Sequence, residues 1–476
     1  MIRIIRRHNL WLLGVLSAAL YGMNLRLADA LIHVGILDSM PAAIESYLIQ
    51  IVPLSLIYFL AVWITARVQD AGKSLMLIVL FALLFRLPLI PLDPVLSSDV
   101  FRYLWEGKVQ VVAEINPYVV PPADDRLTSF RDQAIYSHIN RKEAPTVYPA
   151  GAQLFFALLY KVGVESPQGF KAVALAADAL TLVLLLLILK ELQLPPYRVI
   201  IYLWNPLLIY EFFWSGHVES FMLPPLLGFL YFFLRGHVMA AGAALGLATA
   251  IKLVPLFLLA AVPRGKRLKT LIPFVLVVGF AYLFYAEAGR RILGFLPTYF
   301  YDPYEIFNPG LVQLLLLWVA QLLSFPVSSV RSVLFALLLG ILIMLSRRFA
   351  SSPADIIEKS YAVFAGYLLL IYPAFHPWYL CMLVPLLCLV PSRAWILFSL
   401  LLPFSYLKYL TDDGTMPLWI TAAEFVPLYL LLIWERVSFA MARTGTPALA
   451  RHSGEIGKTL LRESFERRLF RKPANP

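Results

Sequence analysis

The sequence predicts an all-α polytopic membrane protein, a bundle of about 12–14 transmembrane helices with peripheral helices in its extracytoplasmic loops. Its 476 residues are 60% hydrophobic and 14% charged, whereas soluble globular proteins carry about 25% charged residues. The apolar segments are rich in leucine and run for about 15–20 residues, the length that crosses a hydrocarbon core of ~30 Å as a helix. They are continuous and do not alternate with polar residues, which argues against a transmembrane barrel.

Basic residues set the orientation that we expect for these spans, because Lys and Arg collect in cytoplasmic loops. Arg3, Arg6 and Arg7 precede the apolar run from Leu10 to about Leu25 and place the N-terminus inside. No small-residue cleavage site follows that run, so it is expected to stay as the first span. The net charge of +11 has the same origin and does not indicate nucleic acid. We expect a multi-pass protein of a bacterial-type plasma (inner) membrane with both termini cytoplasmic.

The same reasoning divides the chain into a transmembrane domain, residues 1–435, and a basic cytoplasmic tail, residues 436–476. The tail contains a weakly amphipathic stretch, Glu455–Phe470, that is expected to lie on the anionic inner leaflet. The longest polar stretch before the tail, residues 93–149, falls outside. Lys252 and Pro255 interrupt the apolar segment 238–263, which predicts two short half-helices of the kind that line a cavity.

The outer loop contains the candidate catalytic residue. Its sequence from Ser97, SSDVFRYLWEGKVQ, has helical spacing and places Asp99, Arg102 and Glu106 on one segment. Asp99 follows the outer end of the third span, so its carboxylate is expected at the membrane–water boundary, where it can meet the head of a lipid-borne reagent. Asp99 and Arg102 also share a helix face, and a structural ion pair between them is the alternative interpretation.

Further polar residues fall at predicted turns of the same outer face. His217 and Glu219 follow a Trp-Ser-Gly turn, His376 and Tyr379 belong to an aromatic turn, and Lys252 sits inside an apolar helix, where a charge needs a counter-ion or a polar cavity. Each of these residues alone is more often a packed or paired side chain. Together with Asp99 they suit sugar transfer from a lipid phosphate, because a carboxylate can deprotonate the acceptor hydroxyl and cations can stabilise the leaving phosphate.

The order of these motifs resembles that of the GT-C superfamily of membrane glycosyltransferases, which use polyprenyl-phosphate sugars. Within it the chain is most similar to the GT87-like and actinobacterial α-mannosyltransferases. The resemblance covers about residues 70–400 and is carried by SDVFRYLWEGKVQ (98–110), INPY (115–118), VYPAGAQLFFALL (147–159), YLWNPLLIYEFFWSGHVESFML (202–223), AAGAALGLATAIKLVPLFLL (240–259) and HPWYLCMLVPLL (376–387).

This resemblance implies a GT-C type helix bundle and an inverting hexosyltransferase of the EC 2.4 type. Mannose is the favoured sugar, the donor is a polyprenyl-phosphate sugar, and the acceptor is a glycolipid or glycan at the extracytoplasmic face. The general base of the family maps onto Asp99, and its donor-site histidine maps onto His376. The residues expected to bind donor or acceptor are Arg102, Glu106, Tyr148, His217, Glu219, Lys252, His376 and Tyr379.

The chain departs from the family pattern in several places. Glu219 stands where relatives have a different acid, and Tyr148 is followed by Pro-Ala where many relatives have Pro-Pro. Two additional spans precede the catalytic loop, which leaves the role of residues 1–70 open. Asp99 and Glu106 do not form a DxD pair, so no cofactor and no tightly held metal are expected; the partners are the two substrates and membrane lipid, not nucleic acid.

A transporter or flippase of lipid-linked sugars is the main alternative, because broken helices and buried charges also mark transporters. The sequence shows no inverted repeat, and transporters rarely need an outer loop of this length. An acyltransferase with a catalytic histidine is a further alternative. Glucose, arabinose or another sugar in place of mannose is a further alternative.

Overall fold

The computed structural model describes residues 7–34, 40–67, 71–299, 307–347, 352–370, 375–411 and 414–444. All regular structure in these ranges is helical, which confirms the predicted all-α class. Arg3, Arg6 and the amphipathic stretch predicted in the tail lie outside the described residues.

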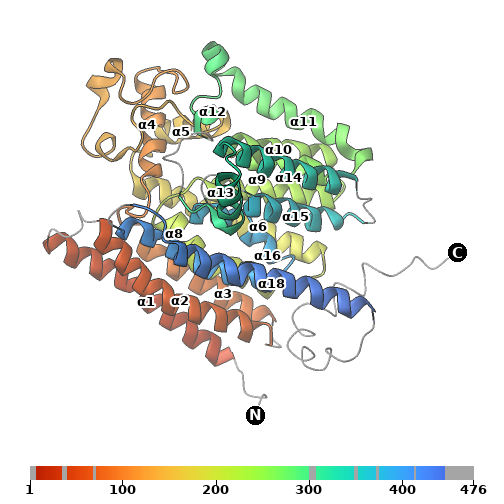
Figure 1. The fold of residues 1–476 in the computed structure, drawn as a ribbon. Coiled ribbons are helices and arrows are strands. Elements are labelled where there is room, and N and C mark those ends of the chain that lie inside the picture. Colours follow the sequence, from red (N-terminus) through yellow and green to blue (C-terminus); the bar gives the residue numbers. More distant parts are fainter. Residues whose placement is uncertain are drawn as a thin grey trace.

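The helices form a bundle around a fully buried segment (Figure 1). The first three helices, α1 (Arg7–Val34), α2 (Met40–Thr65) and α3 (Ala71–Arg86), pack together on one side. The centre is α8 (Pro206–Phe213), which is buried along its whole length. The remaining α-helices are α4 (Asp99–Val112), α5 (Ala150–Lys161), α6 (Pro167–Glu191), α7 (Ile200–Leu203), α9 (Glu219–Leu234), α10 (Val238–Ile251), α11 (Arg264–Leu283), α12 (Leu296–Tyr299), α13 (Gly310–Leu322), α14 (Val327–Arg347), α15 (Asp355–Leu370), α16 (Val384–Leu387), α17 (Arg393–Leu401) and α18 (Leu418–Thr444).

Short 3₁₀ helices interrupt the bundle, and five of those in the described ranges have a proline at their first or second residue. Proline lacks the N–H that would continue an α-helix and is tolerated in a first helical turn. They are η1 (Leu87–Leu89), η2 (Asp125–Phe130), η3 (Tyr136–His138), η4 (Pro196–Val199), η5 (Val254–Ala261), η6 (Ala286–Arg291), η8 (Pro377–Met382) and η9 (Leu402–Leu410).

Within the described ranges, four helices are long and apolar enough to cross a membrane, or five if the bent pair α11 and η6–α12 counts as one span. Several shorter apolar helices accompany them, among them α9, α10 and α13. The predicted number of about 12–14 crossings would require many of these shorter helices to cross as well, and it stays a prediction. The last helix extends beyond the predicted domain boundary at residue 435, because α18 ends at Thr444.

The predicted break in the segment 238–263 is present. Helix α10 ends at Ile251, and Lys252 adopts an extended conformation with φ −142° and ψ 133°. The chain resumes as the 3₁₀ helix η5, which has Pro255 in its first turn. Lys252 therefore lies at a gap between two helical pieces, where its side chain is free to leave the helix axis.

Close packing of α10 on α11 depends on Gly242. A Cβ atom at this position would lie 2.1 Å from the carbonyl oxygen of Thr270 and 2.8 Å from Cγ of Pro273. Gly246, one turn further along α10, faces α11 in the same way, with Phe274 O at 2.9 Å. Small residues spaced four apart let two membrane helices approach closely.

We expect Gly242→Ala to destabilise the protein by about 1–3 kcal/mol, because the new methyl group meets a backbone carbonyl that cannot move aside. Thermal unfolding of the purified protein in detergent measures this change. Gly279→Ala on α11 is the matched control, since a Cβ there has no neighbour within 4 Å. Equal shifts in the two variants would contradict the close-packing role of Gly242.

Candidate active site

Asp99 begins α4, at the end of the bundle where the outer loop gathers (Figure 1). A carboxylate in the first turn of a helix is stabilised by the unpaired N–H groups and by the helix dipole. The side chain is 20% exposed, so a substrate can reach it. Its Oδ1 accepts a hydrogen bond from Asn140 Nδ2 at 3.3 Å, and its Oδ2 lies 3.9 Å from Nδ1 of His217.

An aromatic stack continues from His217 into the bundle. The imidazole of His217 lies 4.1 Å from the Trp378 ring at an interplanar angle of 20°, and that of His376 lies 4.2 Å from the same ring at 11°. Phe307 stacks on His376 in turn, with ring centroids 4.5 Å apart. The stack thus brings both predicted histidines together.

The predicted cation belongs to the same cluster. Lys252 Nζ lies 5.1 Å above the ring of Tyr379, and Tyr379 packs edge-on against His376 at 5.4 Å. Lys252 also forms an ion pair with Glu219, with Nζ 2.5 Å from Oε1. Glu219 is fully buried whereas Lys252 is 20% exposed, so Glu219 is the counter-ion that the buried position of Lys252 requires.

Tyr148 lies close enough to Asp99 for the charge of the carboxylate to act on its phenol. Its ring packs edge-on against Tyr103, with centroids 5.0 Å apart. Desolvation raises the pKa of both phenols, and the neighbouring Asp99 carboxylate raises both pKa values further. Both tyrosines are therefore neutral hydrogen-bonding groups beside the carboxylate at physiological pH.

His376 is also neutral. Desolvation by its neighbours lowers its pKa well below the usual value although part of the ring remains exposed, and His217, Lys252 and Lys408 lower it further. A neutral imidazole stacked between Trp378 and Phe307 offers ring nitrogens for hydrogen bonding without adding charge.

Arg102 and Glu106 instead form a network of their own. Arg102 Nε lies 2.5 Å from Glu106 Oε1, and its terminal nitrogens donate to the carbonyls of Arg141 and Ala144. Glu106 Oε2 accepts from Thr146 and Gln153 at 2.9 and 2.5 Å. Arg102 thus pairs with Glu106, not with Asp99 as the alternative interpretation had it. The network fastens the segment 141–146 to α4.

Glu211 is the residue that sequence reasoning missed. It lies in the buried helix α8, with Oε2 3.1 Å from Nε2 of His217 and Oε1 accepting from the Tyr406 hydroxyl at 2.9 Å. Both Glu211 and His217 have no exposed side-chain surface. The signal was available, because a Glu inside the apolar run PLLIYEFF marks a functional site by default in a membrane protein.

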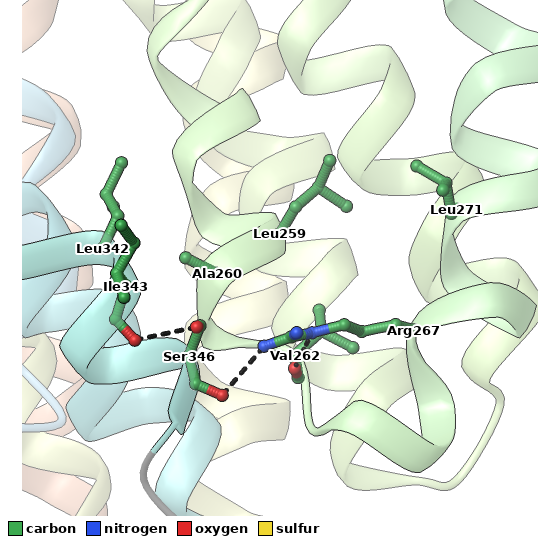
Figure 2. Close-up of a pocket in the computed structure, with 8 residues that line it drawn as sticks. All are labelled: Leu259, Ala260, Val262, Arg267, Leu271, Leu342, Ile343 and Ser346. Carbon is green, nitrogen blue, oxygen red and sulfur yellow. Dashed lines mark hydrogen bonds between the residues drawn. The ribbon is translucent and has the colours of Figure 1, made fainter. Parts of the chain in front are cut away.

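The cavity in Figure 2 is a separate feature. It has a volume of about 360 Å³ and is lined by Leu259, Ala260, Val262, Arg267, Leu271, Leu342, Ile343 and Ser346. Arg267 bridges two walls by donating to the carbonyls of Val262 and Ser346 at 3.0 and 2.9 Å. Arg267 lies in the first turn of α11, and the far end of that helix approaches the outer loop through Tyr285 and Tyr118. The 20 residues of α11, at ~1.5 Å per residue, separate its two ends by roughly 30 Å. The cavity beside Arg267 is therefore remote from the loop that contains Tyr118.

No group of three or more His, Cys, Asp and Glu side chains suited to a metal ion occurs among the residues that the structure describes. The charged groups of the cluster are instead paired with one another or with Asn140.

Residues 10–264 match the family model described as α-(1→6)-mannopyranosyltransferase, N-terminal domain. The chain belongs to this family. No curated protein and no solved structure matches it. The match confirms the resemblance to membrane mannosyltransferases and with it the prediction of an EC 2.4 enzyme. The matched part of this mannosyltransferase contains Asp99, His217, Glu219 and Lys252, whereas His376 and Tyr379 reach the cluster from the chain beyond it.

Proposed function

We propose that this mannosyltransferase is an inverting enzyme that moves mannose from a polyprenyl-phosphate-linked donor to a glycolipid or glycan acceptor, with Asp99 as general base. One observation carries the proposal. Asp99, a partly exposed carboxylate at the start of α4, lies beside His217 in the cluster of stacked side chains. The Lys252–Glu219 ion pair contacts the same cluster through Tyr379.

The chemistry follows from the order of groups in that cluster. In an inverting displacement the base and the acceptor oxygen approach the anomeric carbon from one side while the phosphate leaves on the other. Asp99 stands at one end of the cluster and takes the proton of the acceptor hydroxyl. Lys252 belongs to the same cluster, with its Nζ 5.1 Å from the Tyr379 ring, and stabilises the negative charge that develops on the phosphate.

The surrounding side chains suit a sugar and its lipid carrier. The aromatic rings offer flat apolar faces for the sugar, and the neutral hydroxyls of Tyr148 and Tyr103 offer hydrogen bonds beside the base. Arg102 and Glu106 support the site indirectly, by fixing the segment 141–146. This segment directly follows Asn140, whose amide donates to Asp99.

The proposal includes an orientation. Asp99 and the loop 93–149 face the extracytoplasmic side of a bacterial-type plasma membrane, and both termini are cytoplasmic. The basic residues at the start of α11, Arg264, Lys266, Arg267 and Lys269, then lie at the cytoplasmic side, as basic loop residues of membrane proteins do. Residues 1–435 form the transferase domain and residues 436–476 its cytoplasmic tail.

A donor panel tests the proposal. Purified protein in liposomes is incubated with polyprenyl-phosphate-mannose, polyprenyl-phosphate-glucose or GDP-mannose together with a mannolipid acceptor, and the products are analysed by mass spectrometry. We expect consumption of polyprenyl-phosphate-mannose alone and a mannosylated product. Use of GDP-mannose would contradict the lipid-linked donor, and movement of the lipid-linked sugar across the bilayer without its consumption would indicate a flippase.

A further inference from the structure

We propose that Glu211 and His217 form a buried relay behind Asp99, in which His217 receives the proton taken from the acceptor and Glu211 positions and balances the charged imidazole. This inference rests on the proposed role of Asp99 as general base. It assigns a positioning function to Glu211 and a proton-accepting function to His217 in place of sugar binding.

The three groups lie in a row. Asp99 Oδ2 is 3.9 Å from Nδ1 of His217, and Nε2 on the opposite edge of the ring is 3.1 Å from Glu211 Oε2. The exposed fraction falls from 20% at Asp99 to zero at His217 and Glu211. The row therefore leads from the substrate-accessible carboxylate to a carboxylate in the interior.

The backbone holds this arrangement in place. Gly216 has φ +78°, which reverses the chain after α8, and the N–H of His217 donates to the carbonyl of Glu211 at 3.0 Å. A Cβ at Gly216 would lie 3.2 Å from the side chain of Val100, the residue after Asp99. A glycine at this position thus satisfies both the left-handed conformation and the close approach of α4 to the turn.

The unused hydrogen-bonding capacity of these side chains points toward the relay. Tyr406 satisfies Glu211 Oε1, whereas Glu211 Oε2 and both ring nitrogens of His217 are buried and have no hydrogen-bond partner within the described part of the chain. The contact between Glu211 Oε2 and His217 Nε2 is thus at ion-pair distance without the geometry of a hydrogen bond. Tyr47 of α2 and Cys381 of η8 also lie close enough to Glu211 for its charge to act on them. A buried carboxylate is costly unless it is paired, and His217 is the partner that its free oxygen faces.

The proton transfers balance as follows. The acceptor O–H bond breaks, its proton goes to Asp99, and the oxygen lone pair forms the new bond to the anomeric carbon as the bond to the phosphate oxygen breaks with its electrons. The O–H bond at Asp99 Oδ2 then breaks and an N–H bond forms at Nδ1 of His217. The proton on Nε2 stays in place, and the negative charge of Glu211, 3.1 Å away, balances the imidazolium. After product release the proton returns through Asp99 to water.

The experiment compares Glu211→Gln, His217→Gln and the double variant in full-length protein, with donor and acceptor varied separately. Glutamine keeps the size of Glu211 and removes its charge. We expect kcat to fall at least about tenfold in each single variant, with the donor KM within about twofold of wild type. The double variant is expected to be no slower than His217→Gln, because groups that act as one unit are not additive.

Glu424→Gln is the matched control. Glu424 is also a buried acidic side chain, 1% exposed in α18, where it accepts from Asn308 Nδ2 at 2.5 Å outside the relay. Its kcat should stay at the wild-type value. A purely structural role for Glu211 would lower thermal stability in Glu211→Gln and leave kcat per folded molecule unchanged, which would overturn the relay. Multiplying effects in the double variant would overturn it as well.

If Glu211→Gln does not accumulate, Tyr406→Phe tests the same point by removing the hydrogen bond to Oε1. A loss of kcat at constant donor KM supports the relay, and an unchanged kcat contradicts it. A separate result would refute the proposed function. If Asp99→Asn remains active, Asp99 is not the general base, whatever the activity of Glu211→Gln. If the enzyme uses a mannosyl donor other than the proposed one, the rates of the same variants can be compared with that donor.

Discussion

Asp99→Asn is expected to lower mannosyl transfer by about 100- to 10,000-fold, the usual contribution of a general base. The amide keeps the shape of the side chain and can still accept from Asn140, but it cannot take a proton from the acceptor hydroxyl. Initial rates at saturating donor and acceptor measure the change, alongside the amount of folded protein in size-exclusion chromatography. The fold should be unaffected, because the side chain is partly exposed and lies in the first turn of α4.

Asp124→Asn is the control for this prediction. Asp124 belongs to the same outer loop, caps η2 and forms an exposed ion pair with Arg126 at 2.8 Å. Exposed pairs contribute little, so this variant should retain the wild-type rate. Equal rates for Asp99→Asn and wild type would exclude Asp99 as the base and leave the lipid-linked donor to be tested separately.

Local features of this fold were predictable because they depend on residues close together in the sequence. Helical spacing after Asp99 predicted α4, and the charge and the proline near residues 252–255 predicted the break between α10 and η5. The number of membrane crossings was harder to predict from the sequence. Proline-initiated 3₁₀ segments such as η8 and η9 divide apolar stretches that read as continuous spans.

The pairing of charged side chains could not be predicted in the same way. Arg102 could pair with Asp99 or with Glu106 from sequence spacing alone, and contacts distant in the sequence distinguish these carboxylates and Glu211. Glu106 pairs with Arg102 and accepts from Gln153, 47 residues away. Glu211 lies beside His217 and accepts from Tyr406, 195 residues away. These contacts leave Asp99 with part of its surface exposed, and that difference distinguishes a candidate base from structural carboxylates.

The role of the first helices also became visible only in three dimensions. Tyr47 of α2 packs edge-on against Tyr210 and Tyr406 at 4.8 and 5.6 Å. Tyr58 of the same helix donates to the carbonyl of Ile201 at 2.9 Å. Helix α2 thus packs against α8 and against Tyr406, the hydrogen-bond donor to Glu211, which gives residues 40–65 a structural role in the fold.

Lys252→Met is the second substitution with a large expected effect, and it separates two roles of this lysine. It removes the cation that we place beside the donor phosphate, and it leaves Glu219 buried without its counter-ion. Breaking a buried ion pair by removing one partner costs about 3–5 kcal/mol. We therefore expect both a lower unfolding temperature and a donor KM raised at least about tenfold.

The double variant Lys252→Met/Glu219→Gln tells these effects apart. Replacing Glu219 by a neutral group removes the uncompensated charge, so the unfolding temperature should return toward that of wild type. Donor use should remain impaired, because no cation has been restored. Recovery of both stability and donor KM in the double variant would show that Lys252 serves Glu219 alone and has no part in binding the donor.

Lys108→Met provides the matched control for a lost cation. Lys108 is 22% exposed, close to the 20% of Lys252, and also forms an ion pair with a carboxylate, Asp132, at 2.6 Å. It lies on α4 outside the aromatic cluster, so its loss should leave the donor KM unchanged. A similar rise in donor KM in both lysine variants would indicate a general effect of positive charge on an anionic lipid donor. A rise confined to Lys252→Met would locate the phosphate beside Tyr379, and the reacting sugar would then have to lie between that point and Asp99.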